Sequence, residues 1–228
     1  MSEGLKRTIK YFSRFQLESF VYWLAFALVY GLFLGLLGGH SGEDVTRSMT
    51  YAQTFVLFSS YIVQTNYMTC RSSMAVMMGA TRKNVGKAYW IMTAMLYAET
   101  WLTMAIMRLI NPSEGETPLW FYLICYLLMV SVVNSLSTLA GGISKEPGRV
   151  QTTLQIAAQI VVIACIVGMG LALVAQESLM EGCCRFVFEN PAPVTALKAG
   201  VIGLSVLMLA VFAYRSVKKK INHMEVCI

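Results

Sequence analysis

Charge is scarce in this sequence. Of its 228 residues only 13% are Asp, Glu, Lys or Arg, against about 25% in an ordinary soluble domain. Hydrophobic residues make up 57% of the chain, and its mean hydropathy is +0.61. One small globule cannot bury so much apolar surface, so the composition excludes an ordinary soluble domain and predicts that lipid is the solvent.

The sequence also lacks the motifs that most catalytic and metal sites need. It has only two histidines, His40 and His223, and both lie outside the long apolar segments. It contains no HExxH, no CxxC pair and no GxxxxGK[ST] phosphate-binding loop. We therefore expect no enzymatic activity in this chain and no metal or cofactor bound by it.

Long apolar segments are what the sequence has in abundance. A helix needs about 20 mainly apolar residues to cross a bilayer, and the short connections favour antiparallel neighbours. The predicted fold class is an all-α membrane protein with a six-helix transmembrane domain over residues 17–214. The expected spans are residues 17–38, 51–69, 88–110, 119–141, 152–175 and 194–214, of which the second is interrupted by Gln53, Gln64 and Asn66.

The basic residues predict the orientation, because cytoplasmic loops are enriched in Lys and Arg. With the N-terminus inside, the cytoplasmic segments hold 14 of the 18 basic residues, and both termini are cytoplasmic. The outer side keeps Arg47, Arg108, Arg185 and Lys198. The net charge of +6 is thus explained by topology, and we expect no nucleic-acid partner.

The two ends of the chain differ from the spans. In residues 1–16, Leu5, Ile9 and Phe12 recur at helical spacing among basic residues, which is typical of an amphipathic helix lying on the inner leaflet. A frayed basic tail is the alternative. Residues 215–228 are expected to form a cytoplasmic basic tail.

Polar residues inside the expected spans are candidates for a substrate path, because such residues are costly in lipid. Glu99 lies at the centre of the third span, and near the outer end of that span Arg108 is expected to snorkel to the interface. Asn134 belongs to a polar stripe on the fourth span, and Gln155 and Gln159 share one face of the fifth. The alternative is that these groups hold helices or subunits together.

The segment between the second and third spans, residues 70–87, reads CRSSMAVMMGATRKNVGK. Its MMGATRKNV stretch, with six spans and cytoplasmic ends around it, resembles the first cytoplasmic loop of ABC-2-type transporter permeases. The resemblance implies a coupling helix that docks on a separate ABC ATPase subunit. The residues that would make this contact are Met78, Gly79, Ala80, Thr81, Arg82 and Lys83.

The resemblance implies a division of labour. ATP and Mg²⁺ would bind to the partner ATPase, whereas this chain and a second permease subunit, identical or related, would form the path in a bacterial plasma membrane. The cargo classes it suggests are peptides, lipids and hydrophobic drugs. Two other readings stay open: a substrate-binding membrane component of a vitamin importer, and a scaffold or immunity-type membrane protein that transports nothing.

Overall fold

The computed structural model describes residues 3–38, 43–110, 118–142, 149–174, 182, 186 and 192–222. This part of the chain is helical and contains no strand. Its elements are α1 (Glu3–Gly38), α2 (Glu43–Asn66), the π-helical turn η1 (Tyr67–Arg71), α3 (Ser72–Met77), α4 (Arg82–Ile110), α5 (Leu119–Gly142), α6 (Arg149–Val174) and α8 (Ala192–Asn222).

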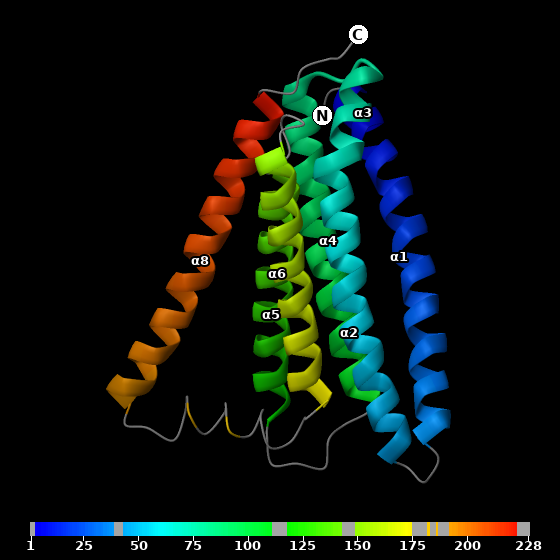
Figure 1. The fold of residues 1–228 in the computed structure, drawn as a ribbon, viewed down its shortest axis with the longest axis vertical. Coiled ribbons are helices and arrows are strands. Elements are labelled where there is room, and N and C mark those ends of the chain that lie inside the picture. Colours follow the sequence, from blue (N-terminus) through cyan, green and yellow to red (C-terminus); the bar gives the residue numbers. More distant parts are fainter. Residues whose placement is uncertain are drawn as a thin grey trace.

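Six long helices run alternately up and down in the described part of the chain (Figure 1). Each expected span lies within one of them, with two exceptions: the last residues of the second lie in η1, and residue 175, the last of the fifth, lies outside the described residues. The start of α1, the short helix α3 and the end of α8 lie at the same end of the bundle (Figure 1). We call this the basic end, because it carries Lys6, Arg7, Lys10, Arg82, Lys83, Lys87, Arg215, Lys218 and Lys219.

Two helices of the described part, α5 and α8, are long and apolar enough to cross a membrane by length and composition. They are packed very differently. The apolar stretch of α5 is 39% buried, whereas only 6% of that of α8 is buried. In Figure 1, α8 lies close to the other helices at the basic end and diverges from them toward its N-terminus.

Apolar side chains are exposed on the outer faces of the bundle, and several polar side chains are buried within it. Large apolar side chains are exposed along α1, α6 and α8, among them Val29, Ile160 and Leu204 at 60% or more. Polar side chains are buried between α2, α4 and α5, as Gln64 and Asn134 illustrate at 0% exposure. A water-soluble monomer rarely exposes a contiguous apolar surface of more than a few hundred Å², so exposed apolar side chains on three helices favour membrane association.

The apolar face of the N-terminal segment is buried against protein, not on a leaflet as the sequence suggested. α1 continues through residue 16 without a break. Phe12 is 0% and Leu5 7% exposed, and both pack in a cluster with Tyr67, Val85 and residues of α8. Phe12 meets the Tyr67 ring edge-on at 5.2 Å. The helical spacing of Leu5, Ile9 and Phe12 was correctly predicted, but other helices of the bundle cover this apolar face.

The other chain end behaves similarly. α8 runs on to Asn222, and its last turns are its best packed part, with Val217 0% and Ile221 5% exposed. Most of the segment expected as a basic tail therefore continues a helix, and residues 223–228 lie outside the described residues.

Candidate functional site: the docking hairpin and the polar core

A tight turn joins α3 to α4 at the basic end. Gly79 has φ +87°, and the N–H groups of Gly79 and Ala80 donate to the carbonyls of Val76 and Ala75, each at 3.0 Å. This is the Schellman arrangement, in which glycine takes the left-handed position after the last helical turn. We call residues 72–87 the docking hairpin, since it contains the six residues that the sequence singles out.

The far side of the turn starts α4. The Thr81 carbonyl and Oγ1 accept the N–H of Asn84 at 2.9 and 3.3 Å, which satisfies one of the amides left over at a helix start. Thr81 thus caps a helix, as expected from its type, and the helix that it caps is the long α4. The turn connects an exposed tip directly to a helix that runs the length of the bundle.

The tip of the hairpin is open to solvent. Met77 is 59% and Met78 74% exposed, and Thr81, Arg82 and Lys83 are also exposed. Of the predicted docking residues only Ala80 is partly buried, against the cluster at the basic end. The structure therefore places flexible apolar side chains and two cations together on one protruding surface.

The first turn of α1 lies beside this tip and forms a pocket with it. The volume of this pocket is about 300 Å³. The approach of the two segments is close: a Cβ on Gly4 would come within 3.0 Å of Asn84 Nδ2. The pocket is lined by Gly4, Arg7, Thr8, Tyr11, Ala75, Met78, Gly79 and Ala80.

The end of α8 lies on the other side of the hairpin. Arg82 Nη1 donates to the Asn222 carbonyl at 3.3 Å, and the rings of Trp90 and Tyr214 pack with centroids 5.2 Å apart. Nothing in the sequence pattern pointed to this contact, because it joins residues 140 positions apart. One cation of the proposed docking motif therefore also holds the last helix.

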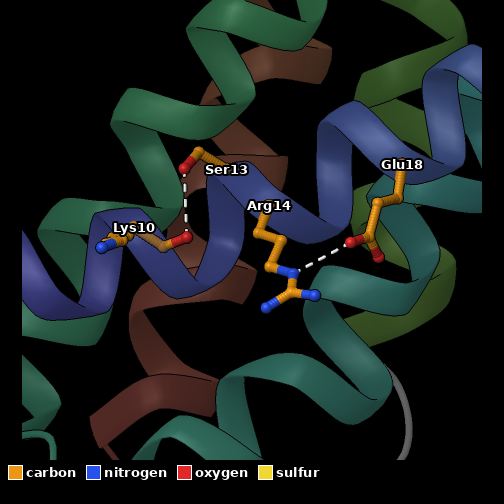
Figure 2. Close-up of polar contacts among 4 residues, drawn as sticks. All are labelled: Lys10, Ser13, Arg14 and Glu18. Atoms are coloured by element: carbon orange, nitrogen blue, oxygen red, sulfur yellow. Dashed lines mark hydrogen bonds and ion pairs between the residues drawn. The ribbon is translucent and has the colours of Figure 1, made fainter.

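The exposed face of α1 carries ordinary surface contacts. Figure 2 shows Ser13 Oγ donating to the Lys10 carbonyl at 3.1 Å and Arg14 Nε donating to Glu18 Oε1 at 2.9 Å. The Arg14–Glu18 pair is well exposed on both sides, so it contributes little to stability. These surface contacts do not fix the position of α1, because its buried face does so.

A polar network lies between α2, α4 and α5. Gln64 Nε2 lies 2.6 Å from Tyr89 Oη, 3.2 Å from Thr93 Oγ1 and 2.8 Å from Thr138 Oγ1, and the last of these is also 3.1 Å from Tyr89 Oη. These four residues join α2, α4 and α5. In the sequence, Gln64 only interrupts the second apolar span. In the structure, its side-chain amide is buried and hydrogen-bonded.

Asn134 sits in a neighbouring contact of the same kind. Its Oδ1 accepts from Ser60 Oγ at 2.9 Å, and its Nδ2 donates to the Val130 carbonyl at 3.0 Å. The polar stripe of α5 thus faces protein. Gln159 is half-buried on α6, and the side chain of Gln155 lies outside the described residues. Within the described residues, no hydrogen bond or ion pair joins Asn134, Glu99 and Gln159 to one another.

Glu99 is paired with the N-terminal helix. Its Oε2 accepts from Gln16 Nε2 at 2.7 Å, and Gln16 Oε1 accepts from Tyr67 Oη at 2.5 Å. No ion pair to Glu99 occurs within the described ranges. The chain of hydrogen bonds connects α4, α1 and η1, and Gln16, which completes it, lay just outside the spans that the sequence defined.

Arg108 corrects another expectation. It is only 3% exposed, and its guanidinium lies 3.8 Å from the centre of the Tyr122 ring. Instead of snorkelling outward it stacks on an aromatic face, which stabilises a cation away from water. No group of three or more potential metal ligands occurs among the residues that the structure describes.

Comparison with known proteins adds no relative: no protein-family model, curated protein or solved structure matches this chain.

Proposed function

We propose that this chain is the membrane-spanning permease subunit of an ATP-driven ABC exporter in a bacterial plasma membrane. The observation that carries the proposal is the exposed tip of the docking hairpin, residues 78–83, at the basic end of a helical bundle with exposed apolar faces. A protein that only needs to stay folded gains nothing from a methionine 74% exposed at the tip of a tight turn. Met side chains adapt well to a partner surface.

The exposed apolar faces support six spans, because they suit lipid tails. The buried side chains of Gln64 and Asn134 have hydrogen-bond partners inside the bundle, as polar groups in a membrane must. The basic end faces the cytoplasm in this proposal, because nine cations gather there and positive charge is retained on that side.

The docking surface combines two segments of the chain. Met78 and Gly79 form one wall of the 300 Å³ pocket, and Arg7 and Tyr11 of α1 form another. Arg82 and Lys83 extend from the same tip. A partner that fits here presents an apolar side chain flanked by carboxylates. In the proposed complex that partner is an ABC ATPase, which binds ATP and Mg²⁺ and performs the hydrolysis.

The chain itself supplies the path, together with a second permease subunit of the same or a related kind. Motion of the ATPases reaches the bundle through α4, which starts at the hairpin. The cargo is a peptide, a lipid or a hydrophobic drug. Glu99 is the described polar residue best placed to contact it, because it is only partly buried and Gln16 satisfies just one of its oxygens.

Affinity purification from the native host in mild detergent, followed by mass spectrometry, tests this proposal. We expect a P-loop ATPase to copurify in stoichiometric amount. The Lys83→Glu variant should lose it while inserting normally, and Arg82→Glu should do the same. Lys218→Glu together with Lys219→Glu changes charge at the same end, on α8 and outside residues 78–83, and should retain it.

Other outcomes would overturn the proposal. Recovery of the chain without any ATPase in several detergents would favour the scaffold or immunity-type reading. A small molecule bound tightly to the purified chain would favour the vitamin-importer reading. Retention of the ATPase by both hairpin variants would show that it docks elsewhere.

A further inference from the structure

A π-helical turn separates the docking hairpin from the long helix α2. In η1 the backbone N–H of Ser72 donates to the carbonyl of Tyr67, five residues back, and Ser72 Oγ donates to the same oxygen at 2.5 Å. Upstream, Asn66 Nδ2 donates to the Ile62 carbonyl at 3.0 Å. A π turn holds one residue more than an α turn in the same place. Here the side chains of Ser72 and Asn66 donate hydrogen bonds to backbone carbonyls in and beside the widened turn.

Both ends of this turn rest on α1. At its start, Tyr67 is 0% exposed and donates to Gln16. At its end, the Arg71 guanidinium lies 4.0 Å from the centre of the Phe15 ring, and Nη1 donates to Tyr11 Oη at 3.2 Å. The contact of Arg71 is half-exposed and that of Tyr67 is buried. The hairpin side of the turn is therefore the more weakly held side.

We propose that the extra residue of η1 gives the backbone the freedom, called slack below, that lets the docking hairpin rotate while α2 stays packed. The rotation moves Tyr67, and the hydrogen bonds of Gln16 transmit this movement to Glu99. This inference rests on the proposed docking of an ATPase at the hairpin, because docking is what drives the rotation. An α-helix turns about 100° per residue. A shift of the extra residue along the helix thus redirects the hairpin strongly while the rest of α2 keeps its partners.

The route from the hairpin to Glu99 is short and continuous. α3 has only six residues, so the tip lies less than two helical turns from Ser72. Ser72 holds the Tyr67 carbonyl, the Tyr67 hydroxyl holds Gln16 Oε1, and Gln16 Nε2 holds Glu99 Oε2. Rotation that pulls Tyr67 away frees the Gln16 amide and leaves the Glu99 carboxylate without its donor.

The slack is tested by deleting one residue from η1, Thr69, in the full chain in lipid nanodiscs. The deletion converts the π turn to an α turn and keeps the helices on both sides in place. In the wild type we expect the amides of residues 67–72 to exchange hydrogen roughly tenfold faster than those of residues 56–64, and in the deletion variant this difference should disappear. Deleting Ser73 from the α turn of α3 is the matched control, and it should lower the thermal midpoint more.

The relay is tested by the reaction of Glu99 with a hydrophobic carbodiimide, quantified by mass spectrometry. Tyr67→Phe keeps the ring and removes the hydroxyl that fixes Gln16. We expect Glu99 labelling to rise roughly fivefold, as for the loss of one hydrogen bond. Tyr89→Phe, which removes another buried hydroxyl from a network without Gln16, should leave labelling unchanged.

Neither measurement needs a partner, so their outcome is separate from that of the purification that tests the proposed function. Equal exchange in wild type and deletion variant, or equal loss of stability in the two deletions, would show that η1 holds no slack. Unchanged labelling of Glu99 in Tyr67→Phe, or an equal rise in Tyr89→Phe, would overturn the relay.

Discussion

Gln64 of α2 forms hydrogen bonds to both α4 and α5. Its amide reaches Tyr89, Thr93 and Thr138 on two other helices. Hydrogen bonds between membrane helices stabilise by about 1 kcal/mol each, less than their burial suggests, because the unfolded helices also find partners. The position of Gln64 between three helices nevertheless makes it a specific determinant of how they pack.

Replacing Gln64 by leucine should lower the thermal midpoint of the purified protein by roughly 5 °C. The substitution keeps the volume approximately, but removes the amide that contacts Tyr89, Thr93 and Thr138 and leaves these three hydroxyls with only one another. Thermal unfolding in detergent, followed by tryptophan fluorescence, measures the change. Gln159→Leu on α6 is the matched control and should shift the midpoint by less. Equal shifts would mean that the network adds nothing beyond general packing.

At the scale of elements, the docking hairpin depends on the backbone of one glycine. Gly79 takes a left-handed conformation, and a Cβ there would meet nothing within 4 Å. Any cost of a side chain at this position is therefore backbone strain alone. Gly86, a few residues on in α4, is the opposite case, because it is helical and a Cβ would make an ordinary contact with Ile221 at 3.8 Å.

Alanine should consequently have opposite effects at these two glycines. Gly79→Ala should destabilise by about 1 kcal/mol, the cost of left-handed backbone with a side chain. Gly86→Ala should stabilise by a similar amount, since glycine is about 1 kcal/mol worse than alanine within a helix. The same thermal assay detects both signs, and ATPase copurification should weaken only in Gly79→Ala. A neutral Gly79→Ala would show that the turn adapts to a side chain.

The long helices could be predicted from the sequence, because long apolar runs separated by short connections are typical of helices packed in apolar surroundings. Each long helix contains all or most of one expected span. What escaped prediction depends on packing between distant segments. The apolar face formed by Leu5, Ile9 and Phe12 could pack equally well on a membrane leaflet or against other helices. The extra residue in η1 cannot be recognised from the sequence, because it is defined by backbone hydrogen bonds and contacts with α1. Gln16 and Gln64 carry no pattern that names their partners, which are 83 and 25 to 74 positions away.

At the scale of the whole molecule, the exposed apolar faces separate a membrane protein from a soluble bundle. Leu204 lies near the middle of α8 and is 61% exposed. In a water-soluble protein, a charge at such an exposed site would change stability by less than about 0.5 kcal/mol. At the centre of a bilayer the same lysine costs about 2.5–3.5 kcal/mol.

We therefore expect Leu204→Lys to impair membrane insertion strongly, so that most of the variant fails to fractionate with intact membranes or is degraded. Met77→Lys, at a site exposed to the same degree (59%) but at the basic end, should insert like the wild type, because its charge stays in water. Extraction of isolated membranes with alkaline carbonate, followed by immunoblotting, measures both. If Leu204→Lys stays with the membranes to the same extent as Met77→Lys, the exposed face of α8 does not lie in lipid, and the six-span arrangement on which the transporter proposal depends would have to be abandoned.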